Sequence, residues 1–246
     1  KGVPVVNLLT MEPGERITAA LAVTAFEPGK YCTFATLKGR VKRIALSEFA
    51  SVRSSGMIAM GLDDDDELGW ARQTSGKDDI LLVTARGQAL RIEETTIRPT
   101  GRTAAGVTGI KLAKGDRVAS MEVVEPEGSL FVITTLGFGK RTPLNEYPVK
   151  GRATGGVSTF DAKNLARTGE ISAARVVQEA DEVTCISSAG MVLRLKVADI
   201  RQSGRATRGS RLVDVKDGDM VASLARLTPE ETAEENGTVK KEKLQA

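Results

Sequence analysis

Short apolar runs separated by turn residues fill most of this chain. Residues 80–83 and 130–133 are continuous runs of Ile, Leu, Val and Phe, as expected of strands buried on both faces. Residues 192–197 alternate apolar and basic side chains, which is typical of a strand with one face in the core and one in water. Turn signals recur at intervals of roughly 8–12 residues, and no long segment has the apolar period of a helix. The pattern predicts an all-β protein.

The predicted strands are grouped in a repeat of about fifty residues. Each repeat carries one short Gly-Arg motif, which we call the marker. The last glycine of the marker falls at residues 2, 56, 106, 156 and 209, at spacings of 54, 50, 50 and 53 residues. Four strands per repeat of this length match a propeller blade, which buries its faces only against its neighbours. The clearest marker copies are Gly101–Val107, Gly151–Val157 and Gly204–Gly209, and a weaker copy is Val52–Gly56.

These repeats predict one propeller-like domain over residues 1–227, with about four full repeats and a partial blade. Residues 228–246 contain five Glu, three Lys and no aromatic residue, so we expect a disordered acidic tail there. Because the chain starts inside a marker, we also interpret it as part of a longer array. The predicted repeats are 1–50, 51–100, 101–150 and 151–203, and the partial blade is 204–227.

Composition excludes several classes of function. The chain has no His, which removes the usual general base and the commonest metal ligand, and neither Tyr31 nor Tyr147 has a neighbouring base. We therefore expect no catalytic site, no metal and no cofactor. The acidic run 63–67 lacks the spaced ligands of a calcium loop and is predicted to be a solvated loop. Cys32 and Cys185 are predicted to be reduced thiols of a cytoplasmic protein, and no apolar run is long enough to span a membrane.

Positive side chains recur in step with the repeat, although the net charge is only +3. Each predicted hairpin turn has a glycine, and an arginine follows that glycine by four residues. A fixed offset places these arginines on the same face of successive blades, where they would form a belt for a long anion. Two alternatives stay open. The hairpin arginines are solvated outer-strand residues whose stems cover apolar surface. The marker glycines only shape the crossover between blades, with Arg102 and Arg152 paired to nearby carboxylates. The predicted DNA-contacting residues are Lys42, Arg43, Arg53, Arg91, Arg102, Lys140, Arg141, Arg152, Arg194, Arg205 and Arg208.

Several of these segments, in their order, resemble the C-terminal domain of the DNA gyrase A subunit. They are residues 2–9, 15–17, 101–107 and 137–143, and the resemblance covers nearly all of 1–227. It implies a β-pinwheel, a ring whose blades exchange strands, with double-stranded DNA wrapped around a basic outer rim without regard to sequence. It also implies two partners that carry the catalytic groups: the breakage-reunion domain, which belongs to the same subunit, and the ATPase subunit.

One family motif is missing. The gyrase box, Gln-basic-Arg-Gly-Gly-basic-Gly, does not occur, and its nearest approach is residues 152–156. The resemblance therefore implies that part of the first blade is absent and leaves complete wrapping open. The alternatives are a topoisomerase IV-type domain that binds DNA without a chiral wrap and a propeller that binds proteins through the loops at one end.

Overall fold

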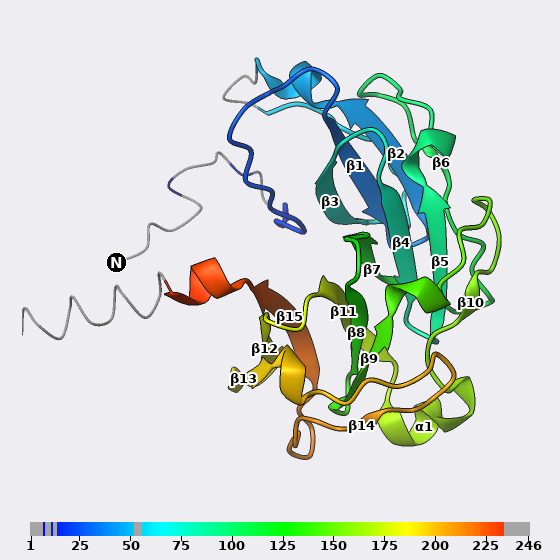
Figure 1. Cartoon of the computed structure of the whole chain (residues 1–246). Helices are drawn as coiled ribbons and strands as arrows, with labels where there is room; N and C mark the ends of the chain where they lie inside the picture. The colour runs from blue at the N-terminus through cyan, green and yellow to red at the C-terminus, as the bar shows by residue number, and fades with distance from the viewer. Residues whose placement is uncertain (1–6, 8–10, 12–13, 52–55, 234–246) are drawn as a thin grey trace, which may run out of the picture.

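The computed structural model describes residues 7, 11, 14–51 and 56–233. Four antiparallel sheets follow one another around an arc, each turned relative to the last (Figure 1). We number them blades 1 to 4 in chain order. The prediction of an all-β, propeller-like fold is therefore confirmed. The strands are β1 (Tyr31–Thr36), β2 (Arg40–Ala45), β3 (Leu68–Thr74), β4 (Asp79–Thr84), β5 (Gln88–Glu93), β6 (Val107–Thr108), β7 (Val118–Val123), β8 (Ser129–Thr134), β9 (Phe138–Pro143), β10 (Val157–Ser158), β11 (Ile171–Val177), β12 (Glu182–Ser187), β13 (Val192–Lys196), β14 (Ser210–Arg211) and β15 (Val221–Leu227).

Helical structure in the described residues consists of short turns. The 3₁₀ turns are Leu46–Phe49, Glu94–Thr96, Leu144–Glu146, Ala162–Asn164 and Val197–Asp199, and the short helix α1 is Leu165–Thr168. Four of these turns follow the hairpin of a blade, where the sequence predicts one-turn pieces. A further helical turn lies at 229–233, where Thr228 and Glu231 cap each other through their backbone N–H groups. This turn departs from the disorder predicted for the tail, of which 234–246 lie outside the described residues.

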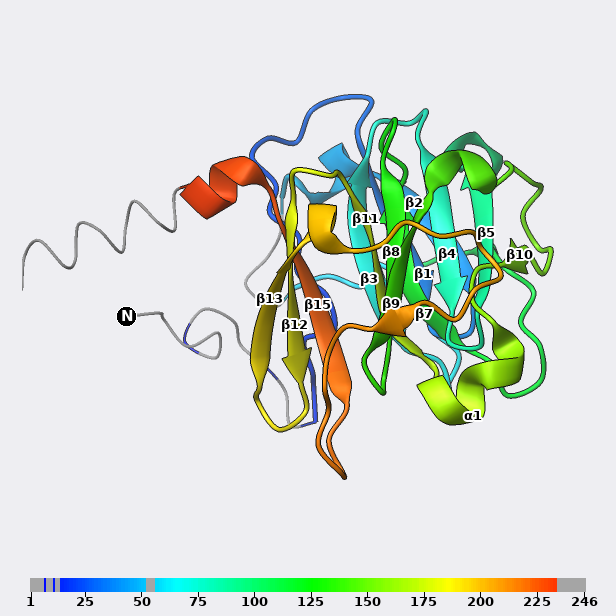
Figure 2. The same ribbon diagram turned by 60° about the horizontal axis from the view of Figure 1, so that its bottom comes forward.

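Each blade is built on one hairpin. From edge to edge, the strand orders of blades 1 to 4 are β3-β1-β2-β6, β10-β5-β4-β7, β11-β8-β9-β14 and β13-β12-β15. The strand β7 lies beside both β3 and β11, and β11 lies beside β15, so these four strands form the inner wall of the arc. The opposite edges, at β6, β10 and β14, form its outer rim. Figure 2 shows blade 4, with β12 between β13 and β15.

Three of the four cores among the described residues lie between neighbouring blades, which explains the continuous apolar runs. Along β4, Ile80 and Leu82 pack with residues of blade 1, whereas Leu81 and Val83 pack with Leu130 and other residues of blade 3. Because side chains alternate along a strand, a strand between two cores must be apolar at every position. The runs predicted to be buried on both faces are therefore central strands that separate neighbouring cores.

The outer strand of a blade comes from farther along the chain. The strand β6 follows the hairpin of blade 2 in sequence but pairs with β2 of blade 1, through Val41 and Val107. In the same way β10 pairs with β5 of blade 2, and β14 pairs with β9 of blade 3. The marker thus leads across to the preceding blade. We call the segments 101–106, 151–156 and 204–209 the first, second and third rim loops.

This exchange changes the predicted blade boundaries. A sheet does not coincide with one predicted repeat, because the strand after each marker pairs with the preceding blade. The segment predicted as a fifth, partial blade is divided: β14 completes blade 3, and β15 is the inner strand of blade 4. The sequence period shows where the unit recurs, but it carries no information on which blade a strand joins.

The exchanged strand makes one glycine far more sensitive than its counterpart. Gly137 and Gly190 occupy the same hairpin position in blades 3 and 4, with φ of 80° and 86°. An added Cβ at Gly137 would overlap the carbonyl oxygen of Val213, beyond β14, whereas at Gly190 it would meet nothing within 4 Å. We expect G190A to cost about 1–2 kcal/mol for its backbone conformation alone. G137A is expected to cost at least about 3 kcal/mol, since backbone must also move.

Urea unfolding of the two variants measures this difference. Equal losses for G137A and G190A would show that the exchanged segment does not press on the turn of blade 3.

Candidate nucleic-acid interface

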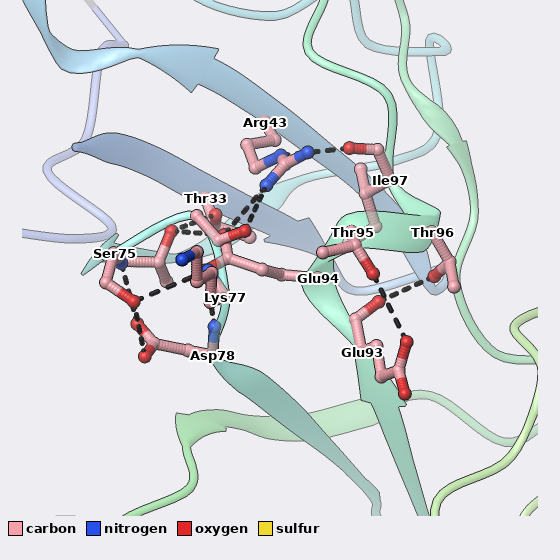
Figure 3. Close-up of polar contacts among 12 residues, drawn as sticks. Thr33, Arg43, Ser75, Lys77, Asp78, Glu93, Glu94, Thr95, Thr96 and Ile97 are labelled. Carbon is pink, nitrogen blue, oxygen red and sulfur yellow. Dashed lines mark hydrogen bonds and ion pairs between the residues drawn. The ribbon is translucent and has the colours of Figure 1, made fainter. Parts of the chain in front are cut away.

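The hairpin arginines lie where the next repeat crosses the blade. Arg43 donates from Nε to the carbonyl oxygen of Ile97 at 2.9 Å, and its Nη1 lies 3.3 Å from Glu94 Oε2 (Figure 3). Its guanidinium also stacks 4.5 Å from the centre of the Tyr31 ring. Arg43 is 5 % exposed and Glu94 is fully buried. This guanidinium therefore holds the return segment of blade 2 against blade 1.

The equivalent arginines repeat this arrangement. Arg91 pairs with Asp79 at 2.7 Å and donates to a carbonyl oxygen of the following repeat. Arg141 donates to the carbonyl oxygen of Ile200 at 2.7 Å and pairs with Glu179 at 3.3 Å. Arg194 pairs with Glu182 at 3.3 Å.

The structure places Arg43, Arg91 and Arg141 in contacts between blades and not on an exposed belt, whereas Arg194 is exposed and its predicted contact with phosphate stays a prediction. Their positive charges are matched by carboxylates, and the first three also bond backbone carbonyl groups between blades. In blades 1 to 3 the equal offset from the turn glycine has a structural cause, because the arginine at this position clamps the next return segment.

Lys42 and Lys140 are buried as well, so neither lies on an exposed outer belt. Lys42 Nζ donates to the carbonyl oxygens of Ala59, Arg102 and Ala104. Lys140 Nζ lies 2.6 Å from the carbonyl oxygens of both Gly204 and Arg205. Both lysines are 1 % exposed, and burial lowers the pKa of Lys140 to about 8. Each ammonium anchors a rim loop from beneath, the first by Lys42 and the third by Lys140.

We expect the replacement R141A to affect stability and not DNA binding. It removes the donor that satisfies the carbonyl oxygen of Ile200, which should cost about 1–3 kcal/mol. Because its charge is already paired with Glu179, the salt dependence of DNA affinity should stay that of the unmodified chain. Thermal unfolding and DNA titration at several salt concentrations check both points. A salt slope lowered by one unit would return Arg141 to the interface.

The marker arginines, in contrast, lie on the outer rim. Arg102, Arg152 and Arg205 occupy one position in the three rim loops, each just before an outermost strand. Arg102 and Arg152 are exposed; the guanidinium of Arg152 bonds the carbonyl oxygens of Thr96 and Thr108 at 3.2 and 3.3 Å. Arg205 is partly exposed, and its closest carboxylate is Glu146 at 3.9 Å. These bonds orient the guanidinium groups without burying them.

The structure adds cations that the sequence reasoning missed. Arg98 and Arg201 are exposed and lie four residues before the marker arginines of the first and third rim loops. In the second loop Pro148 takes that place, and Lys150 lies exposed two residues before Arg152. For Arg98 and Arg201, the constant distance from the marker was the signal that could have identified them. Among the predicted residues, Arg208 is exposed on the third loop, and Arg53 lies outside the described residues.

The acidic run of blade 1 covers part of its positive charge. Asp63 pairs with Arg40 at 3.3 Å, and Asp65 pairs with Lys38 in the same hairpin turn. Glu67 pairs with Arg16 at 2.7 Å. The run predicted to be a solvated loop is thus held by ion pairs. In the described part of the chain, no group of three or more acidic, Cys or His side chains is arranged to hold a metal ion.

The structure also locates the two cysteines and bears on the possibility of a membrane-spanning segment. Cys32 and Cys185 are free and buried. Within the described ranges, no helix has both the length and the apolar character needed to cross a bilayer.

Comparison with known proteins agrees with this geometry. The family model described as the DNA gyrase C-terminal domain, beta-propeller, matches residues 30–75, 78–125, 128–178 and 181–228. Each match begins at or just before the hairpin of one blade and ends at or just after its inner strand. The family unit therefore follows the inner three strands of a blade, whereas the predicted repeats began at the marker.

Two similar proteins are DNA gyrase A subunits of different bacteria. The chain is 42 % identical over 227 residues to the protein of Salmonella typhimurium, covering 92 % of this chain and 26 % of that protein. It is 41 % identical over 234 residues to the protein of Staphylococcus epidermidis, covering 94 % of this chain and again 26 % of that protein.

Two solved structures share the fold. The C-terminal domain of DNA topoisomerase IV superposes with a TM-score of 0.87 at 28 % identity, covering 98 % of this chain and 75 % of that one. A DNA gyrase A C-terminal domain superposes with a TM-score of 0.85 at 22 % identity, covering 92 % and 75 %. The chain spans about a quarter of the curated gyrase proteins, 26 % of their length. It belongs to the family of DNA gyrase C-terminal β-propeller domains.

Proposed function

We propose that this domain binds double-stranded DNA along its outer rim and bends it, as the non-catalytic DNA-wrapping part of a gyrase-type topoisomerase. The observation that carries the proposal is the recurrence of Arg102, Arg152 and Arg205 at one position in the three rim loops. Guanidinium groups at regular intervals on a curved surface suit the phosphates of a duplex that follows the curve. Such contacts carry no base code, so the binding is independent of sequence.

The charge on the rim is sufficient for bending. Bending a site of 20–30 base pairs by 40–90° costs on the order of 1–6 kcal/mol. Each rim loop, together with the few residues before it, presents two or more positive side chains, counting Arg98, Lys150, Arg201 and Arg208 beside the marker arginines. Release of counterions from the neutralised phosphates offsets the cost of bending. The paired hairpin arginines contribute indirectly, because they fix the positions of the loops.

The domain acts within a larger enzyme in this proposal. Its partners are the breakage-reunion domain, which belongs to the same subunit, and the ATPase subunit; they supply strand cleavage and ATP hydrolysis, and the location is the cytoplasm. The wrapped segment is presented to the cleavage site with positive handedness, which supports negative supercoiling. No cofactor is assigned to the domain itself.

The salt dependence of DNA affinity tests the proposal. A duplex of ~130 base pairs, enough to follow several rim loops, is titrated with the domain between low and moderate salt. We expect the logarithm of the association constant to fall steeply and linearly with the logarithm of salt concentration, by about 0.9 for each phosphate neutralised. A flat response would exclude the rim as a phosphate-binding surface.

A topoisomerase IV-type domain that bends DNA without a chiral wrap is the second candidate. It is favoured by the similarity to the topoisomerase IV structure, with its TM-score of 0.87. Ligation of nicked circular DNA in the presence of the domain separates the two. Positive supercoils trapped after ligation support chiral wrapping, and relaxed products with intact DNA binding support the second candidate.

A further inference from the structure

A cavity of about 240 Å³ opens at the third rim loop. The loop lies over β9 of blade 3, and Lys140 ties it down through the carbonyl oxygens of Gly204 and Arg205. Gly209 lies so close to the backbone of β9 that an added Cβ would overlap the carbonyl oxygen of Gly139. Strand β9 therefore holds the third rim loop in one position, and the loop forms a fixed wall of the cavity. Its lining includes Lys140, Arg201, Ser203, Thr207, Arg208 and Ser210.

The lining is positive and rich in hydrogen-bond donors. It has three cationic side chains and three hydroxyl groups, and no carboxylate belongs to it. Arg201 and Arg208 are both exposed, and neither guanidinium is engaged in an ion pair or hydrogen bond within the described ranges. Lys140 Nζ donates to Thr207 Oγ1 at 3.2 Å, and the Thr207 hydroxyl donates to the carbonyl oxygen of Gly204 at 2.9 Å, so these two groups hold the loop. The guanidinium groups of Arg201 and Arg208, with the hydroxyl of Ser210 beside them, suit a compact anion with several acceptor oxygens, and a phosphate group has this character.

The other two rim loops lack these features. In the place of Arg208 the first loop has Ala105 and the second has Gly155. After the loop, the place of Ser210 is taken by Val107 and Val157. The third loop thus has an added cation and an added hydroxyl at positions that are small or apolar elsewhere. The fold does not need either group, since two of the three loops form without them.

We infer that the cavity at the third rim loop holds one backbone phosphate of the bound duplex and anchors the DNA at blade 3. The inference rests on the proposed function. The first and second loops offer exposed arginines along the path of the duplex, whereas the third encloses a single phosphate between Arg201, Arg208 and the hydroxyl of Ser210. The duplex is thereby held most tightly at one point of the protein surface, at blade 3.

The double replacement R208A/S210V tests the inference. It places at these positions the residues that the first loop has naturally, Ala105 and Val107, so it should fold. The matched control is R98A, which removes one exposed cation just before the first loop and leaves the cavity intact. Three measurements are made on each protein. Binding of inorganic phosphate is followed by ³¹P NMR without DNA. Affinity for the ~130-base-pair duplex is measured at several salt concentrations, and the bound duplex, with fixed ends, is mapped by hydroxyl-radical footprinting.

We expect R208A/S210V to lose phosphate binding, to weaken DNA affinity about tenfold near 0.1 M salt and to lower the salt slope by about one unit, as for one phosphate contact. Its footprint should lose the protection contributed by blade 3. R98A should retain phosphate binding and that protection.

The outcomes separate the inference from the proposed function. If the unmodified domain binds DNA with the expected salt slope but R208A/S210V matches it in affinity and footprint, the anchor is wrong and DNA binding by the rim stands. Loss of phosphate binding without any change in DNA affinity would assign the cavity to free phosphate and overturn the anchor too. Absence of salt-sensitive DNA binding in the unmodified domain would overturn the proposed function itself.

Discussion

Replacement of the three marker arginines, R102A/R152A/R205A, is expected to weaken DNA binding about 10²- to 10³-fold near 0.1 M salt. Each arginine that neutralises a phosphate contributes about 0.9 to the salt slope, and therefore nearly a factor of ten at this salt concentration. All three lie on the outer rim, and none is buried. The slope itself should fall by about two to three units. Stability should change little, because the packing between blades does not depend on these side chains.

A matched triple variant controls for net charge. Lys77, Lys163 and Lys216 are exposed and belong to none of the three rim loops, so K77A/K163A/K216A removes the same charge from other positions. We expect its salt slope to equal that of the unmodified domain. DNA titrations at four or more salt concentrations, with circular dichroism to confirm folding, decide the result. Equal losses for both triple variants would mean that overall charge, and not the placement of the marker arginines, governs binding.

The variant E122A is expected to lose about 3–5 kcal/mol of unfolding free energy. Glu122 lies on β7, the inner strand of blade 2, and its side chain is 9 % exposed. Its Oε1 accepts from Arg72 on β3 at 3.0 Å and from Arg175 on β11 at 2.7 Å. One carboxylate thus joins blades 1, 2 and 3 at the inner wall. Its removal leaves two guanidinium groups close together without a counter-charge, which is the costly way to break a buried ion pair.

Two further variants identify the cause. Glu179 pairs with Arg141 but is 74 % exposed, so E179A should cost no more than about 1 kcal/mol. The triple variant R72M/E122L/R175M replaces the whole ion group by apolar side chains and should recover most of the loss. Urea unfolding provides all of these free energies. If the triple variant is as unstable as E122A, Glu122 acts through packing and not through its charge.

The alternation of residues along the strands explains why the fold class was predictable. Ile80 and Leu82 face one core and Leu81 and Val83 face the next. The continuous apolar run 80–83 therefore indicated a strand that is buried on both faces. Gly137 likewise has positive φ in a hairpin turn, as its place between two apolar runs predicts. These features depend on local geometry, which a sequence pattern records directly.

The candidate site was predicted only in part, and the reason is physical. Arg43 and Arg102 recur with the same regularity, but the first is 5 % exposed within an ion pair and the second is exposed on the rim. A repeat preserves a side chain that clamps two blades as faithfully as one that meets a ligand. Lys140 does not lie on an exposed belt for the same reason, since its long stem brings the ammonium to carbonyl groups 64 and 65 residues away.

The sequence by itself determined the strands, their grouping in fifty-residue units and the chemical character of the markers, because each is set by neighbours within a few residues. Only the tertiary structure decided which blade receives each exchanged strand and therefore which positive side chains reach solvent. Val107 pairs with Val41 across the blade boundary, and that pairing places Arg102 on the rim while the return segment covers Arg43. Burial and charge pairing are properties of such long-range contacts, and they are not encoded in the period of the chain.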